Sequence, residues 1–386
     1  MRVPVLLWGD IIKGKSPITR RTLVGERAHE CMYAWVYLTD FLAIRRLIEE
    51  YNKLKEENKD FNIVKNLDSN TWSNISRPKI DPHFQVKKDN FYIASLVNGL
   101  AKSSNQNAID IVEFGQTFYT LIDKVELLNL INKTESPKLT WKGIDNSEFV
   151  NITANFLHKD KVIKIYEDWK KYEKSDFSIL TSRFVISYAI PSSKELVKFI
   201  SQNFNAIVIE DAFSTTEKDE QVFNHGQKQT FYNINYVIKE LEELGYEIKV
   251  LSHYGDHPGG SRPCHIVKTL CVKKGIFNLS QAAEYVKEFG FSLDPIIFEK
   301  NNLLETLNSR ITSLQWSQIK NNKKVNPVWD QTSFQKESLK NKLKNALRPF
   351  YYRLQILKNG LGSHDLRGTN MNESLIDYIH NEGKTE

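Results

Sequence analysis

The sequence contains few of the residues that mark secreted or membrane-embedded proteins. Its three cysteines, Cys31, Cys264 and Cys271, are too few for a disulfide scaffold and suit a reducing compartment. No run approaches the roughly 20 apolar residues that cross a bilayer, so no transmembrane segment is expected. The apolar stretch at 3–8 is shorter than the roughly 7–15 residues of a secretory signal. We therefore expect a cytoplasmic protein.

Proline and glycine are also modest, at 11 and 17 of 386 residues, which argues against extensive disorder. The length leaves room for about two to three domains. The net charge of +6 is mild but uneven, because residues 320–358 hold ten lysines and arginines against two acids. Such a run is either a solvated helix face or a surface for an anionic partner, such as phosphate, an anionic glycan or a membrane.

Three segments follow from the pattern of apolar residues. Residues 1–104 are expected to be a helical accessory region, with a long amphipathic helix at 26–58 and a shorter one at 91–102. Residues 105–277 alternate between strand-like and helix-like stretches. Residues 278–386 are expected to be a helical, basic region with a break at 326–329.

The middle segment predicts a doubly wound α/β fold with a mainly parallel, seven-stranded sheet. The last two strands have no helix between them, so the last one is expected to be antiparallel. The expected strands cover 109–114, 139–145, 161–166, 177–183, 205–211, 246–254 and 265–273. The expected helices cover 119–132, 147–157, 193–203 and 230–244, the last one ending at Gly245.

Acidic residues and one glycine stand at the ends of the first three strands. Glu113 and Gly115 close the first strand, Asp145 follows the second, and Asp168-Trp169 follows the third. In an open parallel sheet, ligands bind outside the carboxyl ends of the strands. These residues are therefore candidates for a nucleotide-like ligand.

The strand order and these strand-end residues together resemble a class I S-adenosylmethionine (SAM) dependent methyltransferase. The resemblance covers residues ~105–275 and implies SAM as cofactor, with the Gly115 turn beside its methionine part. It further implies that Asp145 binds the ribose diol, that Asp168 takes the adenine amino group, and that Trp169 stacks on the ring. The glycine-rich turn is degenerate, because Gln116 and Thr117 stand where further glycines are common.

Each of these positions also has a plainer explanation in the sequence. Gly115 alone is an ordinary turn glycine, and Asp145 is a good N-cap for the helix that follows. Asp168 and Trp169 fit a surface turn with one anchoring aromatic residue. Arg183, at the end of the fourth strand, either lines the site for SAM and an anionic substrate or pairs with a carboxylate such as Glu113.

Candidate catalytic residues follow the later strands. Asp211, next to Glu210 at the expected end of the fifth strand, is a possible general base, a ligand for a divalent cation or a helix cap. The segment 253–265 brings His253 and His257 close in sequence to a cysteine and a third histidine, but their spacing matches no zinc signature, so no metal site is expected. A neutral imidazole suits proton abstraction near pH 7, which also makes His225 a candidate.

Three functions remain open at this point. The first is SAM-dependent methylation of a hydroxyl on a sugar, glycan or other small molecule, with the flanking helical regions forming the acceptor site. The second is RNA methylation or nucleic-acid binding through the stretch at 336–358, which combines a basic helix with aromatic residues. The third is a catalytically inactive, methyltransferase-like scaffold, which the degenerate turn allows.

Overall fold

The structure is a computed structural model, and it describes the central part of the chain. The described residues are 51–59, 86–115, 120–132, 137–146, 151, 154, 158, 161, 164–224, 227–256, 262–299, 302–311, 313 and 315–317. Residues 51–56 are helical, in keeping with the end of the helix expected at 26–58. The basic run at 320–358 and the break at 326–329 lie outside the described residues.

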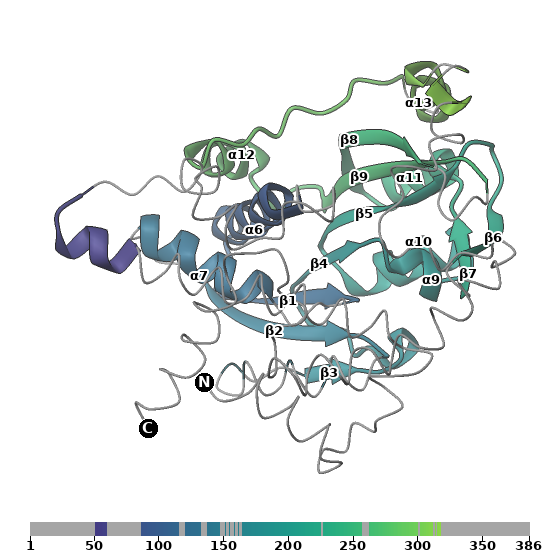
Figure 1. The fold of residues 1–386 in the computed structure, drawn as a ribbon. Coiled ribbons are helices and arrows are strands. Elements are labelled where there is room, and N and C mark those ends of the chain that lie inside the picture. The colour runs from purple at the N-terminus through teal and green to yellow at the C-terminus, as the bar shows by residue number, and fades with distance from the viewer. Residues whose placement is uncertain are drawn as a thin grey trace, which may run out of the picture.

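A seven-stranded sheet forms the centre of the fold, and its strand order is β3-β2-β1-β4-β5-β9-β8 (Figure 1). Strands β1 to β5 pair in parallel, and β9 is antiparallel to both of its neighbours. The predicted mainly parallel sheet with an antiparallel last strand is therefore confirmed. The strands are β1 (Ala108–Phe114), β2 (Lys138–Ile144), β3 (Lys164–Tyr166), β4 (Ser178–Arg183), β5 (Ala206–Ser214), β8 (Tyr246–Asp256) and β9 (Cys264–Lys273).

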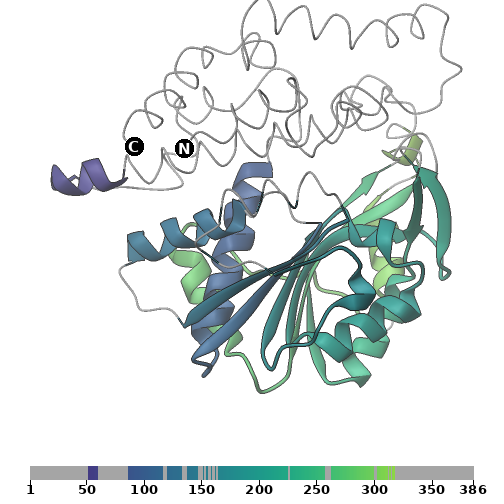
Figure 2. The same cartoon turned by 90° about the horizontal axis from the view of Figure 1, so that it is seen from below.

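Helices cover both faces of this sheet, as Figure 2 shows. One face packs under α6 (Val86–Ser103), α7 (Thr120–Asn132) and α12 (Leu279–Glu288). The other packs under α10 (Ser193–Asn203), α11 (Ile234–Glu243) and α13 (Leu303–Arg310). Alternation of side chains along β1 explains the two cores, because Ile109 and Ile111 face the first set while Val112 and Phe114 face the second.

Local capping fixes where several of these helices begin. Ser192, Asn233 and Asn278 each accept a hydrogen bond from a backbone N–H in the first turn of α10, α11 and α12. The helix expected at 193–203 therefore has the predicted bounds. The helix expected at 230–244 begins later, at Ile234, because the residues before Asn233 belong to a strand.

That strand is part of a hairpin that the sequence analysis did not predict. It consists of β6 (Glu220–Asn224) and β7 (Gln227–Phe231), between β5 and α11. Strand β5 itself continues to Ser214, so Glu210 and Asp211 lie inside it and not at its end. The strand expected at 161–166 is shorter and begins at Lys164. A short helix, α9 (Ile186–Ala189), follows β4.

The helices next to the predicted domain boundaries share a hydrophobic core with the sheet. Leu96 and Val97 of α6 and Ala282 and Val286 of α12 are buried in the same cluster as the first face of the sheet. The predicted division at 1–104, 105–277 and 278–386 stays a prediction. After α12, residues 291–299 form no helix, in contrast to the expected helical region, and they run along the sheet to α13.

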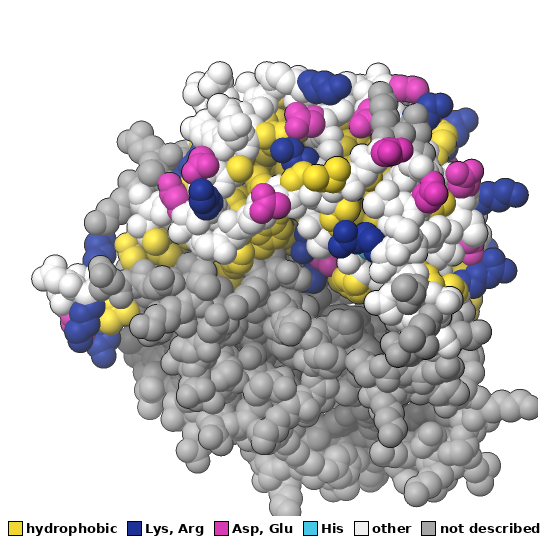
Figure 3. All heavy atoms as spheres, turned by 90° about the horizontal axis from the view of Figure 1, so that it is seen from above, with side chains coloured by type: hydrophobic (Ala, Val, Ile, Leu, Met, Phe, Trp, Pro, Cys, Tyr) yellow, Lys and Arg dark blue, Asp and Glu magenta, His cyan; other side chains and the backbone are white. Residues whose placement is uncertain are grey.

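The outer surface of the described part carries charges of both signs. Figure 3 shows lysines, arginines and acidic residues interspersed among apolar side chains on one face. None of the helices in the described ranges is both long enough and apolar enough to pass through a bilayer.

Candidate functional site

The carboxyl ends of β1, β2 and β3 lie side by side at one edge of the sheet. The backbone N–H of Gly115 donates a hydrogen bond to the carbonyl of Ile144 at 2.7 Å. One strand further on, the N–H of Asp145 donates to the carbonyl of Tyr166 at 3.0 Å. Gly115 and Asp145 are thus held on neighbouring strands, and the turn that contains Asp168 follows the third strand. We call this row the strand-end site.

Gly115 is the residue that the backbone of this site most requires. Its φ is +66°, a left-handed conformation that side chains rarely adopt. A Cβ atom at this position would also lie 2.4 Å from both Cγ atoms of Val185. The glycine therefore permits close contact between the β1 turn and the segment after β4. Residues 116–119, which follow in the sequence, lie outside the described residues.

Glu113 is buried at the end of β1, on the face covered by α7. Its Oε1 atom has no hydrogen-bond partner among the described residues. Burial raises the pKa of Glu113 to about 8, with a smaller opposing effect from Lys124. Arg183 does not pair with Glu113 and binds a different carboxylate, so that possible partner of Arg183 is excluded.

Asp145 and Asp168 differ in how the structure uses them. The carbonyl of Asp145 accepts a hydrogen bond from the Asn151 side chain at 3.0 Å, and its carboxylate is half-buried. Asp168 is the N-cap of the short helix η3 (Trp169–Lys171), and its Oδ1 accepts from the Lys170 N–H at 3.0 Å. The ring of Trp169 packs edge-on against Phe199 of α10, with centroids 5.3 Å apart. The structure therefore agrees with a surface turn that one aromatic residue anchors, and one carboxylate oxygen of Asp168 already accepts a hydrogen bond from the backbone.

Arg183 at the end of β4 pairs with Glu210 of β5, its register neighbour. The Nε–Oε2 distance is 2.7 Å, and the Nζ of Lys268 on β9 lies 3.7 Å from the same oxygen. The side chains of Glu210 and Lys268 are only 3% and 4% exposed. One buried carboxylate therefore forms ion pairs with two cations, and these ion pairs connect β4, β5 and β9.

Asp211 points to the opposite face of β5 and is bound by backbone groups. Its Oδ2 accepts from the N–H of Ser187 at 3.0 Å, in the first turn of α9, and its Oδ1 accepts from the N–H of Ala212 at 2.8 Å. Burial raises its pKa to about 6, although these hydrogen bonds oppose the shift. Asp211 therefore anchors the first turn of α9 through the N–H of Ser187.

His253 lies within β8, as the strand expected at 246–254 implies, and not in a loop between two strands. Its Nε2 is 2.9 Å from the Nδ1 of His265 on β9. β8 is four positions from β1 in the strand order, which at about 4.8 Å per strand is roughly 19 Å. The structure thus does not bring His253 next to Gly115. His225 and His257 lie outside the described residues.

The strand order settles the fold of this domain. A sheet in the order 3-2-1-4-5, continued by an antiparallel strand between β5 and β8, has the topology of the class I methyltransferases. The domain has the class I methyltransferase fold. No family model and no curated protein matches the sequence.

Several solved methyltransferase structures are similar to this chain at low identity. An O-methyltransferase from a polyketide synthase of Brevibacillus brevis, in complex with S-adenosylhomocysteine, is 12% identical with a TM-score of 0.34, covering 53% of this chain and 86% of that one. A SAM-dependent methyltransferase from Mesorhizobium loti is 12% identical with a TM-score of 0.32, covering 47% and 97%. The 23S rRNA methyltransferase ErmE is 9% identical with a TM-score of 0.30, covering 68% and 87%. At these values the fold assignment depends on the strand order itself.

Two features of this methyltransferase fold were missed in the sequence, although both left a signal. Lys268 is a charge in the interior of the mostly apolar strand HIVKTLCVK, which ends at Lys273, and a buried lysine requires a partner. Between the segments that form β6 and β7 the sequence reads Asn224-His225-Gly226, which is typical of a turn, and residues suited to strands flank it. The role of Val185 had no such signal.

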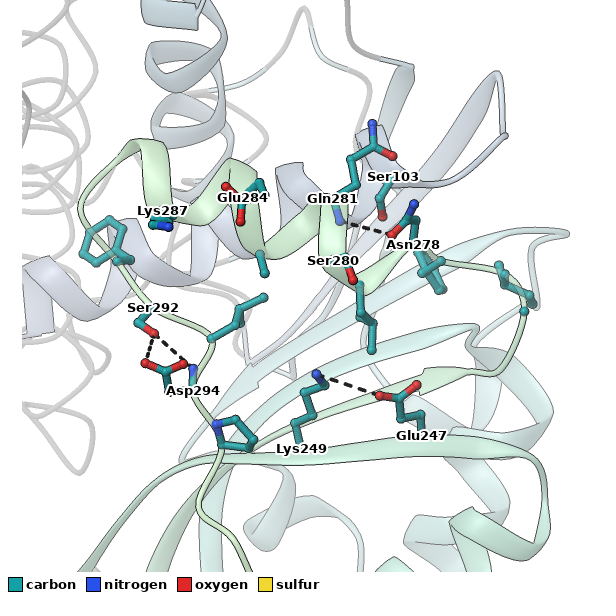
Figure 4. A pocket seen from close by; sticks show the side chains of 18 of the residues that line it. Ser103, Glu247, Lys249, Asn278, Ser280, Gln281, Glu284, Lys287, Ser292 and Asp294 are labelled. Carbon is teal, nitrogen blue, oxygen red and sulfur yellow. Dashed lines mark hydrogen bonds and ion pairs between the residues drawn. The ribbon is translucent and has the colours of Figure 1, made fainter.

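A hollow of about 1070 Å³ lies at the opposite end of the strands, between α12 and β8 (Figure 4). Its walls include Glu247 and Lys249 of β8 and the start of α12, where Asn278 caps the helix. Because Glu247 and Lys249 are in the first half of β8, the hollow is separated from the strand-end site by the length of the sheet. We assign it no role in binding a cofactor.

Proposed function

We propose that this domain binds SAM at the strand-end site and catalyses methyl transfer. The observation that carries the proposal is the pair of backbone hydrogen bonds from Gly115 and Asp145 to the neighbouring strands. They hold a left-handed glycine and two acidic turns in one row, at the edge where open α/β sheets bind ligands.

The donor and acceptor chemistry of this row suits the parts of SAM. The carboxylate of Asp145 is able to accept two hydrogen bonds from a ribose diol. The free acceptor capacity of Asp168 suits the adenine amino group, and Trp169 is the aromatic residue next to it. The buried Oε1 of Glu113 has no partner among the described residues and suits the ammonium of the methionine part. SAM supplies an electrophilic methyl group on a sulfonium ion.

The contribution of the protein to such a reaction is mainly positioning. Holding an acceptor oxygen in line with the methyl group replaces a bimolecular encounter by an ordered one. We propose a hydroxyl acceptor on a sugar, glycan or other small molecule, whose proton a base must take. Since Asp211 is occupied by two backbone N–H groups and His253 is distant from β1, the candidate bases are His257 and His225.

Calorimetric titration with SAM tests the proposal. We expect micromolar binding that weakens at least tenfold in Asp145→Ala. Asp176→Ala is the matched control, because Asp176 is an exposed aspartate before β4, at the other end of the strands, and its loss is expected to leave the affinity unchanged. Absence of binding up to millimolar SAM contradicts the proposal and favours the inactive scaffold, in which Val185 closes the Gly115 turn.

A further inference from the structure

A chain of hydrogen bonds fixes which ring nitrogen carries the proton in two histidines, His253 and His265, near the carboxyl end of β8. The Asn308 side chain on α13 donates from Nδ2 to the carbonyl of Thr215 at 3.3 Å, so its Oδ1 is the acceptor. The Nε2 of His265 lies 2.8 Å from that oxygen and must donate to it. The Nδ1 of His265 is then an acceptor, and the Nε2–H of His253 donates to it at 2.9 Å.

The last member of this relay therefore presents a lone pair. With its proton on Nε2, neutral His253 has an unprotonated Nδ1, and this atom has no hydrogen-bond partner among the described residues. Burial, followed by the nearby His265 and Arg310, lowers the pKa of His253 to about 4. The imidazole thus stays neutral at pH 7 and keeps its acceptor.

An aromatic residue and a cation lie near this pair of histidines. The ring of Trp316 is 5.5 Å from that of His265, and Trp316 is half-buried. It approaches β8 closely because Gly255 has no side chain, since a Cβ there would lie 2.9 Å from the Trp316 ring and 2.5 Å from Ile311. Arg310, exposed at the end of α13, adds N–H donors.

We propose that His253, Trp316 and Arg310 form a subsite for a hydroxyl-rich unit of an extended acceptor, of the oligosaccharide class. The lone pair accepts from a sugar hydroxyl, the indole packs on the C–H face of the ring, and the guanidinium donates to a second oxygen. The subsite is near the carboxyl end of β8, which points to the same edge as β1. Its distance of roughly 19 Å from β1 suits a distal unit of an acceptor whose reacting hydroxyl lies at the strand-end site. The inference deepens the proposed function and depends on it.

The relay itself is tested by nitrogen NMR on the full chain labelled with ¹⁵N-histidine. We expect His253 to show a protonated Nε2 and an unprotonated Nδ1 at pH 7, with its signals identified from their loss in His253→Phe. Asn308→Asp keeps an acceptor for His265 and is expected to preserve this pattern, whereas Asn308→Leu is expected to lose it. A protonated Nδ1 on His253 in the wild-type protein overturns the proposal, whatever the variants do.

Binding is tested with maltotetraose and cellotetraose as probes, followed by tryptophan fluorescence and calorimetry. We expect at least one of them to bind the wild-type protein below 10 mM, with a loss of at least tenfold in His253→Phe and in Trp316→Leu. Tyr254→Phe is the matched control, because the side chain of Tyr254 lies on the other face of β8. We expect the affinity of this variant for the tetrasaccharides to equal that of the wild type.

Three results overturn the subsite. The first is that neither tetrasaccharide binds the wild-type protein, and the second is that His253→Phe binds them as tightly as the wild type does. The third is that a single-stranded RNA binds in a way that requires His253 and excludes the sugars. Titration of the same samples with SAM keeps the two proposals distinct. Absence of SAM binding contradicts the proposed function, whereas the histidine NMR tests the hydrogen-bond relay independently of SAM.

Discussion

Gly115 and Val185 are in contact so close that a methyl group on the glycine would lie 2.4 Å from both Cγ atoms of the valine. We expect Gly115→Ala to destabilise the fold by about 2–4 kcal/mol, since it adds left-handed strain to overpacking. Denaturant unfolding measures this cost. Gly245→Ala is the control, because it has a positive φ but an open Cβ position, and it is expected to cost only about 1–2 kcal/mol.

A second variant separates the two causes in Gly115→Ala. Adding Val185→Ala removes the overlap with the two Cγ atoms but keeps the Cβ of residue 185, which would lie 2.5 Å away, so it is expected to recover part of the steric loss and to leave the backbone strain. If Gly115→Ala and Gly245→Ala cost the same, the contact with Val185 has no energetic role.

The carboxylate of Glu210 forms ion pairs with two cations inside the sheet, so we expect its neutralisation to destabilise the fold strongly. Glu210→Gln leaves Arg183 and Lys268 near each other without the carboxylate, and we expect a loss of about 3–5 kcal/mol in the free energy of unfolding. Glu243→Gln removes an exposed partner of Lys239 and is expected to cost less than about 0.5 kcal/mol. Equal effects of the two variants in urea unfolding would falsify the buried role of Glu210.

The raised pKa of Glu113 predicts that the free energy of unfolding falls as the pH rises. Its pKa is about 8 in the folded protein against an ordinary value of 4.5, so the folded state binds the proton more tightly. The stability then falls between about pH 4.5 and pH 8. We expect Glu113→Gln to flatten this part of the profile and to be more stable than the wild type at pH 8. An unchanged slope in thermal melts over this range would contradict the assignment.

The lowered pKa of His253 predicts the opposite dependence of the free energy of unfolding on pH. Its pKa is lowered from 6.5 to about 4, so its contribution is present above pH 6.5 and is lost as the pH falls through 4. His253→Phe removes this proton uptake and is expected to reduce the decline between pH 6.5 and pH 4. Potentiometric titration of both proteins across the unfolding transition checks it, and equal proton uptake would show that His253 does not titrate in this range.

Much of the fold was predictable because strand and helix signals are local. The apolar run of β1, the capped helix α10 and the lone glycine after α11 each follow from a few neighbouring residues. The errors occurred where pairing partners decide the length of a strand. β5 continues through Asp211 to Ser214 because β9 pairs with it over its whole length, which no local pattern at 211 indicates.

The candidate site divides in the same way. Acidic residues after β1, β2 and β3 were visible as strand-end residues, and parallel pairing made their adjacency predictable. The partners of Arg183 and Asp211 were not visible, since each partner comes from a segment far along the chain or from backbone groups. The sequence placed His253 and His265 in successive expected strands, but only the pairing of β8 with β9 shows that their rings meet.

By itself, the sequence determined the order of the seven strands of the main sheet and the residues at the ends of its first three strands, because periodicity, caps and turn residues act within a few positions. Only the tertiary structure decided which side chains meet: Val185 on Gly115, Lys268 on Glu210, and Asn308 on His265. These contacts join distant segments, and their geometry depends on how strands pair and how helices pack on the sheet. They are therefore properties of the whole fold, which short stretches of sequence do not encode.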